Sequence, residues 1–412
     1  MSFYDKNRPV VTGVGVIAPN GIGIDDFWRT LVAGESAIGR ITRFDASQLK
    51  AQIAGEVSGF DPHTWVDPSF KVTRRARHTQ FAMAATAMAL QDARIDLRRD
   101  RLDHPLPLLI GIGSSSFEMI STSAVAIAGK GPRHATPVLI AECSPHSVAG
   151  ALAEFLGVPT SCSTFSSACA AGLDAIAAAA ERILQGEADL VLAGGTETPI
   201  SMVPMANFDN AGMASRQNSD PKKASRPFDN KRDSGVISEG CGMLVLENLE
   251  NALARGVEPY LEVVGWGTHT DEIDKPCSGL EFSMKKALAN AALLPEDIEY
   301  ICAWGPGHPL IDRVETDMIK RVFGRHAYAL AVSSIKGVIG NPLAAAGPLM
   351  LISCCLAFRH GVVPPTANYE EPDPNCDLDY VPGTGRPSAV RYALLNAHGV
   401  GGANTSMIVK RI

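Results

Sequence analysis

One cysteine stands where the sequence changes abruptly from a strand pattern to a helix pattern. The hydroxyl-rich run SCSTF at 161–165 is followed by Cys169 and then by an alanine-dominated stretch that predicts a buried helix over 170–185. A cysteine in the first turn of such a helix faces the positive end of the helix dipole and free backbone N–H groups. Both features favour a thiolate and an oxyanion beside it, as acyl transfer through a thioester requires. The alternative is that Cys169 is a small apolar residue packed among alanines.

The composition limits the possible functions of the chain. Its 412 residues exceed the size of one simple core, so two fused halves are expected, over 1–255 and 256–412. The net charge of −7 does not favour nucleic-acid binding as the main role. No uninterrupted apolar run is expected to reach the length of a membrane span. The nine cysteines are scattered without C-x-x-C pairs, so neither a metal site nor a disulfide framework is predicted, and a cytoplasmic location fits.

Similar strand and helix patterns occur in both halves. Apolar or alternating runs predict strands at 10–18, 53–57, 106–113, 190–194, 261–267, 298–304 and 330–334. Helical periodicity predicts helices at 25–33, 77–92, 144–156, 170–185, 279–292 and 343–359. A polar stretch at 215–233 is expected to lie on the surface. Each half thus has a glycine- or alanine-rich turn into a core helix, which predicts a pseudo-duplicated, layered α/β fold.

Three segments resemble motifs of the β-ketoacyl-acyl-carrier-protein synthases. They are SSACAAG at 166–172, PFDNKRD at 227–233 and SEGCG at 238–242. The resemblance extends in order over 10–409 and is closest to the elongating synthases of fatty-acid and polyketide pathways. It implies a thiolase-like five-layer αβαβα fold and a homodimer or a heterodimer with another ketosynthase subunit. It also implies no tightly bound cofactor, and a substrate carried as a thioester on the phosphopantetheine arm of an acyl carrier protein or on coenzyme A.

Two positions depart from the catalytic pattern of that family, which performs decarboxylative condensation with a cysteine and two histidines. By the resemblance, Trp304 and Asn341 occupy the two histidine positions. Neither can shuttle a proton, because an indole N–H only donates and a carboxamide does not titrate. Both can still donate a hydrogen bond to a thioester carbonyl or an enolate. Alternatively, Asn341 only caps the helix that begins at Pro342, and Trp304 only fills the pocket.

Two other histidines fall near the same site by the resemblance. His308 takes the position of a threonine that lines the pantetheine tunnel, and His398 takes that of a phenylalanine close to the nucleophile. Each is a candidate base at neutral pH, unless His398 only fills space and bonds a backbone carbonyl. Val400 replaces a phenylalanine that gates acyl entry in the family. The backbone N–H groups of Cys169 and Val400 are expected to hold the oxyanion.

The resemblance also assigns supporting roles to charged residues. Lys336 and Glu315 match a pair that organises the active-site water network, or they form a buried ion pair kept for folding. The predicted contacts to an acidic carrier protein are Lys71, Arg74, Arg75 and Arg216. The alternative for the first three is the solvated start of a helix.

Two functions remain open from the sequence. In the first, the chain is an acyltransferase or condensing enzyme that carries the acyl group on Cys169. Its Cys-Trp-Asn set makes ordinary malonyl-decarboxylating elongation the least supported reaction. In the second, it is a catalytically silent, chain-length-factor-like subunit that shapes the tunnel of a partner synthase. The loss of both histidines favours the second function. The intact cysteine favours the first, because chain-length factors that resemble this family generally lack it.

Overall fold

The computed structural model describes residues 7–97, 99, 104–114 and 116–412. Its main sheet has eleven strands, and ten of them, five from each half of the chain, form one continuous order. The first five are β1 (Pro9–Ala18), β5 (Leu106–Gly111), β6 (Thr160–Phe165), β7 (Leu190–Glu197) and β8 (Gly240–Asn248). The second five are β9 (Leu261–Thr270), β10 (Tyr300–Cys302), β11 (Ala331–Ser333), β14 (Tyr392–Gly399) and β15 (Ala403–Lys410).

The two sets of strands have the same order and the same directions. The first runs β6-β5-β7-β8-β1 and the second runs β11-β10-β14-β15-β9. In each set the first three strands are parallel and the remaining pairings are antiparallel. β1 and β9 pair through Val10↔Glu262 and Val11↔Leu261, which joins the sets into one sheet together with the short β2 (Gly21–Ile22). This repetition confirms the predicted pseudo-duplication.

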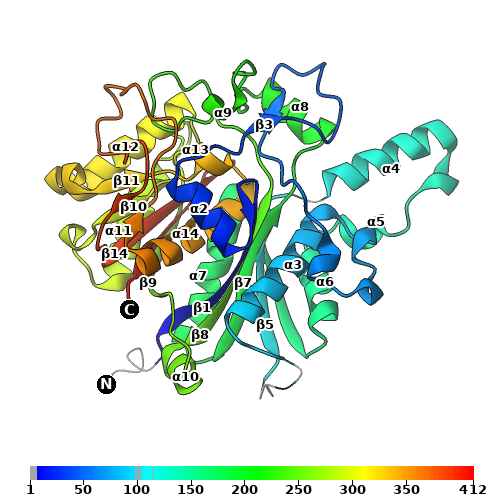
Figure 1. Ribbon diagram of the computed structural model, residues 1–412, viewed down its shortest axis with the longest axis horizontal. Helices are drawn as coiled ribbons and strands as arrows, with labels where there is room; N and C mark the ends of the chain where they lie inside the picture. The colour runs from blue at the N-terminus through cyan, green and yellow to red at the C-terminus, as the bar shows by residue number, and fades with distance from the viewer. Residues whose placement is uncertain (1–6, 98, 100–103, 115) are drawn as a thin grey trace.

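Helices form three layers around the two sets of strands (Figure 1). In the centre, α7 (Ala171–Leu184) and α14 (Ala346–His360) contact each other; α7 packs on β5 and β7, and α14 packs on β8 and β14. Outside, α3 (Arg77–Asp92) covers β1 and β8, with α6 (Ser147–Leu156) beside it. α11 (Gly279–Ala291) covers β9 and β15, with α12 (Pro309–Phe323) beside it. The predicted αβαβα layering is confirmed.

Shorter elements complete the described chain. The remaining α-helices are α2 (Ile24–Val32), α4 (Phe117–Lys130), α5 (Leu139–Glu142), α8 (Met202–Asn210), α9 (Pro221–Ala224), α10 (Leu249–Ala254) and α13 (Lys336–Ile339). The short strands are β3 (Gly39–Arg40), β4 (Ile53–Ala54), β12 (Val362–Val363) and β13 (Arg386–Pro387). The 3-10 turns are η1 (Pro62–Thr64), η2 (Pro68–Phe70), η3 (Val72–Arg74), η4 (Pro132–His134), η5 (Ala168–Ala170), η6 (Pro295–Asp297), η7 (Gly324–Ala329) and η8 (Leu343–Ala345).

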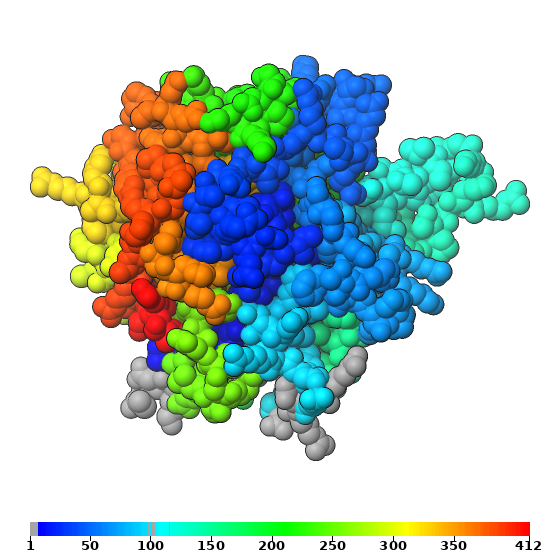
Figure 2. All heavy atoms as spheres, viewed as in Figure 1, coloured from blue at the N-terminus to red at the C-terminus, as the bar shows by residue number. Residues whose placement is uncertain are grey.

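α4 stands away from the body of the molecule (Figure 1), and Figure 2 shows the corresponding teal segment protruding from it. This region exposes large apolar side chains: Phe117, Val125, Ile127 and Ile140. β6 lies at the end of the strand order, so one edge of the sheet is unpaired within the described chain. Exposed apolar side chains and an open strand edge are features of an interaction surface.

Two expectations about individual segments were wrong. The predicted strand at 298–304 is only β10, because the chain turns into a loop after Cys302. The stretch at 215–233 is not a surface excursion throughout, since residues 224–229 are buried. There Arg226 donates to Asp229 over 2.8 Å, and Asp229 also accepts the N–H groups of Glu370 and Glu371 over 2.7 and 2.6 Å. The polar side chains of this segment therefore link it to distant parts of the chain.

One helical segment, Leu343–His360, is long and apolar enough to cross a membrane by length and composition. The expectation that no run approaches this length was therefore wrong. Within the protein, 89% of this segment is buried, and α14, which forms most of it, lies in the central helix layer. Burial between the two sets of strands accounts for its apolar composition.

Candidate active site

A small cavity of about 90 Å³ collects the residues predicted to do chemistry. Its walls include Cys169, Trp304, His308, Asn341, His398 and Val400. These residues follow or end the strands β6, β10, β11 and β14, and the carboxyl ends of parallel strands meet at one edge of a sheet. The remaining walls are mostly apolar, so the cavity places a few polar groups in an apolar surrounding.

Cys169 lies in η5, on a sharp turn between β6 and α7 that we call the first elbow (residues 166–172). Ala168 adopts a left-handed backbone with φ of 52°, which costs an alanine about 1 kcal/mol or more. β14 approaches the turn closely at Gly399, where a Cβ would lie 2.6 Å from the carbonyl oxygen of Ser167. The glycine thus lets the end of β14 lie against the elbow.

The thiol of Cys169 is almost fully buried, and burial raises its pKa to about 12. The negative charge of Glu197 contributes to this rise, whereas the backbone N–H groups of Val400 and of Cys169 itself, and the charge of Lys336, act in the opposite direction. The N–H groups thus favour the thiolate as expected, but desolvation outweighs them and keeps the thiol protonated at neutral pH. The two N–H groups that act on the sulfur are those predicted to hold an oxyanion.

His398 is the penultimate residue of β14, and its Nδ1 lies 3.0 Å from Oδ1 of Asn404. Asn404 in turn donates its Nδ2 to Oδ1 of Asp271 over 2.7 Å. Burial lowers the pKa of His398, and both the bond to Asn404 and the charge of Asp271 raise it. The alternative that this ring bonds a backbone carbonyl was wrong, because its partner is a side chain.

His308 occupies the N-cap of α12 and has a different environment. Its Nδ1 accepts the backbone N–H of Leu310 over 3.2 Å, so this lone pair satisfies the start of the helix. Burial and the nearby charge of Arg232 both lower the pKa of the ring. His308 is therefore neutral at pH 7, with Nε2 carrying the proton.

Trp304 is held by the two predicted supporting residues. Glu315 accepts the backbone N–H groups of Trp304 and Gly305, each over 2.8 Å, and Lys336 donates to the carbonyl oxygen of Trp304 over 2.6 Å. The Lys336 ammonium also lies 3.9 Å from the centre of the indole ring. Burial lowers the pKa of Lys336 to about 8 and raises the pKa of Glu315. Both charged groups thus fix the Trp304 segment of the cavity wall.

Asn341 does not cap a helix, contrary to the alternative drawn from its sequence. The following turn, η8, begins at Leu343 with a left-handed φ of 49°, and it has no side-chain cap. The backbone of Asn341 is fixed by bonds to Val236 and Ser238 over 2.7 and 3.0 Å, while its Oδ1 is buried without a partner in the described chain. Its carboxamide is therefore left to face the cavity.

The four residues predicted to contact a carrier protein are not equivalent. Lys71 precedes η3 and Arg74 is its last residue, and both are exposed. Arg75 pairs with Glu142 over 3.2 Å and also with Glu154. Arg216 pairs with Asp209 over 2.9 Å and is about half exposed. Arg74 and Arg75 line one groove of about 440 Å³ together with Arg43 and Arg77.

Three acidic or amide residues near the elbow were missed from the sequence, namely Asp271, Asn404 and Glu197. Glu197, at the end of β7, accepts the N–H of Gly113 over 2.7 Å and bonds Ser114, and burial raises its pKa to about 7. The glycine-rich segment HGVGGAN at 398–404 was the signal for Asn404. Asp271 and Glu197 gave no local signal, because only the fold brings them near the cavity.

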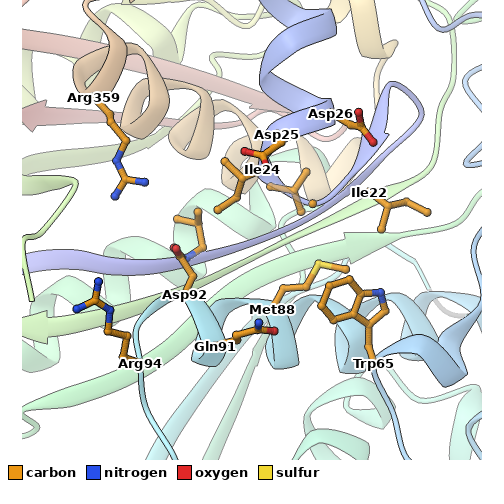
Figure 3. A pocket seen from close by; sticks show the side chains of 13 residues that line it. Ile22, Ile24, Asp25, Asp26, Trp65, Met88, Gln91, Asp92, Arg94 and Arg359 are labelled. Carbon is orange, nitrogen blue, oxygen red and sulfur yellow. The ribbon is translucent and has the colours of Figure 1, made fainter.

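A wider groove of about 880 Å³ lies between α2, β1 and α3 and contains none of the predicted residues. Figure 3 shows the carboxylate of Asp92 gathered at one end with Arg94 and Arg359. Asp92 accepts from Val14 N–H and from the Tyr260 hydroxyl, which also accepts from Arg359, all over 2.8 or 2.9 Å. These groups satisfy one another, and the described lining of the groove has no thiol, hydroxyl or histidine side chain, so we place the chemistry in the smaller cavity.

Comparisons with known proteins agree with the geometry. The family description "Beta-ketoacyl synthase, N-terminal domain" matches residues 6–252, and "Beta-ketoacyl synthase, C-terminal domain" matches 260–370. The chain is 40% identical to "Putative polyketide beta-ketoacyl synthase 1" of Streptomyces halstedii, over 98% of both chains. It is 38% identical to "3-oxoacyl-[acyl-carrier-protein] synthase 2" of Synechocystis, over 100% of both.

Solved structures give the same result. A "type II PKS acyl-carrier protein in complex with its ketosynthase bound to the hexaketide" superimposes with a TM-score of 0.91 at 31% identity, covering 98% of this chain and 99% of the other. "The ishigamide ketosynthase/chain length factor" superimposes with a TM-score of 0.90 at 31% identity, with the same coverage.

Proposed function

This chain belongs to the β-ketoacyl synthase family, and on that premise we propose that it is an acyltransferring or condensing enzyme of fatty-acid or polyketide biosynthesis. The acyl group is carried as a thioester on Cys169. The single observation that supports this function is the cavity in which Cys169, the Val400 N–H and His398 meet. The thiol is the nucleophile, the two backbone N–H groups stabilise the oxyanion, and the histidine accepts the thiol proton.

The proposed reaction differs from ordinary malonyl-decarboxylating elongation. Trp304 and Asn341 replace the two histidines of the family pattern, and both serve as hydrogen-bond donors to a thioester carbonyl. His308 donates from Nε2, since its Nδ1 is engaged with Leu310. Lys336 and Glu315 support the site by fixing Trp304.

The experiment that tests this function follows acyl transfer and two-carbon extension separately. The protein is incubated with acyl-loaded and malonyl-loaded acyl carrier protein, and the carrier species are weighed by mass spectrometry. We expect loss of the acyl group from its donor without two-carbon extension of the chain, in the wild type and in Cys241→Ala but not in Cys169→Ala. Two-carbon extension at a rate typical of a synthase would contradict the proposal.

A second candidate function is that of a catalytically silent, chain-length-factor-like subunit. The replacement of both histidines favours it, as does the similarity to a ketosynthase/chain length factor structure. Under this function no donor would acylate Cys169, and the chain would affect product length only when it is combined with an active synthase. Retention of the cysteine and of the N–H groups around it favours the first candidate.

We propose an acyl carrier protein as the donor, with its phosphopantetheine arm (or coenzyme A) as the substrate carrier and no tightly bound cofactor. A relative is described as an acyl-carrier protein in complex with its ketosynthase. Lys71 and Arg74 are the proposed contacts that are free to meet an acidic partner, whereas Arg75 and Arg216 would have to exchange an existing ion pair.

We further propose a homodimer or a heterodimer with another ketosynthase subunit. The open edge of β6 and the exposed apolar side chains of α4 support this assembly. The division of the chain into halves over 1–255 and 256–412 is a proposal supported by the repeated strand order. A cytoplasmic location is proposed from the kinds of protein to which the chain is similar.

A further inference from the structure

The two histidines of the cavity carry their ring protons on opposite nitrogens. His308 accepts a backbone N–H at Nδ1, so its proton lies on Nε2. His398 has its Nδ1 3.0 Å from Oδ1 of Asn404. If that oxygen is an acceptor, the Nδ1 of His398 must donate, and its Nε2 keeps a free lone pair.

The orientation of the Asn404 carboxamide is fixed by its other contacts. Its nitrogen donates to three oxygens: Oδ1 of Asp271 over 2.7 Å, the carbonyl of Gly402 over 2.9 Å and the carbonyl of His269 over 3.2 Å. A flipped amide would place an oxygen against all three acceptors. The atom that faces His398 is therefore the amide oxygen, and the ring donates to it.

Asp271 anchors this arrangement from the connection between β9 and α11. Its carboxylate accepts the backbone N–H groups of Cys277 and Gly279 over 2.8 and 2.9 Å, so its position is set by the start of α11. Its Oδ2 lies 3.8 Å from Nδ1 of His398. The negative charge therefore stabilises His398 when the ring becomes protonated.

We propose that Asn404 and Asp271 are positioning residues that hold His398 with its proton on Nδ1 and its basic Nε2 free for the thiol of Cys169. This inference rests on the proposed function. The Nε2 lone pair takes the thiol proton as the sulfur forms its bond to the acyl carbon. The bond between that carbon and the donor sulfur breaks, and the leaving thiolate takes the proton back from His398.

The charged and titratable groups that face His398 come from three elements. Asp271 lies on the side of β9, Cys169 lies on the first elbow, and His308 lies across the cavity at the start of α12. Asp271 is the acidic group among them, and its charge raises the pKa of His398. Removing that charge should therefore lower the pKa of His398.

The first test observes the tautomer directly. In the full-length protein labelled with ¹⁵N-histidine, long-range ¹H–¹⁵N correlations report which ring nitrogen carries the proton, and His398→Ala identifies the signal. We expect a protonated Nδ1 for His398 in the wild type, and a protonated Nε2 as the main form in Asn404→Leu. A protonated Nε2 in the wild type would overturn the inference without any assay of activity.

The second test measures acyl transfer from acyl carrier protein in a single turnover between pH 5 and 9. We expect Asn404→Leu to be at least about tenfold slower than the wild type. In Asp271→Asn, which keeps the acceptor oxygen, we expect the acidic limb of the profile to move to lower pH. Asn290→Leu, an exposed asparagine on α11, is the control.

The outcomes distinguish the proposed function, in which His398 is the base, from the inference that Asn404 and Asp271 position it. If His398→Ala itself transfers the acyl group at the wild-type rate, the base assignment in the proposed function is wrong. If His398→Ala is slow while Asn404→Leu and Asp271→Asn retain the wild-type rate and profile, His398 is the base and the positioning inference is wrong. The tautomer measurement on the wild type remains decisive if Asn404→Leu or Asp271→Asn does not fold.

Discussion

In the first half of the chain, Ala168 with φ of 52° and the turn η5 lead into α7; in the second half, Leu343 with φ of 49° and the turn η8 lead into α14. We call residues 341–347 the second elbow. With the two helix starts aligned, SSACAAG at 166–172 matches NPLAAAG at 341–347, and Cys169 corresponds to Ala344. The same left-handed turn thus occurs twice, once with a nucleophile and once without.

The two elbows contact each other at Gly172 and Gly347, which are equivalent positions of the two halves. A Cβ on Gly172 would lie 2.2 Å from the carbonyl oxygen of Ala344, and a Cβ on Gly347 would lie 2.8 Å from Cβ of Leu173. Neither position has room for a side chain without a shift of backbone. The duplicated turn therefore provides a shared scaffold.

The surroundings of the elbows differ in polarity. In α7, Asp174 accepts from the hydroxyls of Ser167 and Thr405, which ties the first elbow to β15. The corresponding residue of α14 is Leu349, which is fully buried in the apolar core. The comparison teaches that the repeated backbone sets the geometry, whereas a few polar side chains decide which copy holds the chemistry.

The largest expected effect comes from removing the base that faces the first elbow. His398→Ala should slow acyl transfer by about 10² to 10⁴-fold, because the buried thiol then has no proton acceptor. Single-turnover transfer from acyl carrier protein checks this. His326→Ala, whose ring bonds the carbonyl of Ile298 in the second half, should leave the rate unchanged. An unaffected rate in His398→Ala would remove this residue from the mechanism.

The pH dependence of Cys169 alkylation tests whether burial, which raises the pKa of this thiol, outweighs the helix dipole, which lowers it. Burial raises the pKa of this thiol to about 12, so its reaction with iodoacetamide should rise by about tenfold per pH unit between pH 7.5 and 9.5. Because the pKa of the Cys169 thiol is raised in the folded protein, the contribution of this thiol to the free energy of unfolding is present at neutral pH and is lost as the pH rises toward 12. Peptide mapping by mass spectrometry measures the rate. A plateau below pH 8 would indicate a resting thiolate and contradict this account.

A side chain added at Gly172, where the two elbows touch, should destabilise both elbows together. Gly172→Ala places a methyl group against the carbonyl of Ala344 and should lower the free energy of unfolding by about 2 kcal/mol or more. The matched control is Gly150→Ala on the exposed side of α6, where a Cβ meets open space and should add up to about 1 kcal/mol of helix stability. Thermal or denaturant unfolding compares the two. Equal stabilities would mean that the elbows do not constrain each other.

The smallest effect concerns the entrance to the cavity. Val400 is 59% exposed at the cavity wall, and Val400→Phe keeps the backbone N–H while narrowing the opening. Loading of long acyl chains relative to short ones should fall by roughly fivefold, the equivalent of about 1 kcal/mol. Competition between donors of different chain length measures this ratio, with Val400→Ile as the conservative control. An unchanged ratio would count against a gating role.

Local patterns predicted the elements well where local residues decide them. The helix predicted at 77–92 coincides with α3, because its apolar positions recur with helical spacing, and Arg94 beyond its end has a left-handed φ of 54°. The layered fold followed from two similar series of strands and helices. The meeting of Cys169, Trp304, His308, Asn341, His398 and Val400 in one cavity follows from family motifs that lie far apart in the chain.

The errors arose where the fold overrides a local rule. Asn341 followed by proline has the sequence of a helix cap. However, Leu343 has a left-handed backbone, so the helix starts later and the carboxamide of Asn341 has no helix N–H groups to cap. The dipole argument for Cys169 omitted desolvation, which depends on the packing of both halves. The role of Asp271 could not be predicted from the sequence, because it depends on contacts with Asn404 and His398, which lie on two other strands.

The most direct measurement is intact-protein mass spectrometry after incubation with a panel of acyl carrier protein and coenzyme A thioesters. The account predicts one acyl adduct that maps to Cys169, is lost in Cys169→Ala and persists in Cys354→Ala, which removes a cysteine from α14 behind the second elbow. An adduct on any other cysteine, or none with every donor, would contradict the claim that the first elbow holds the chemistry.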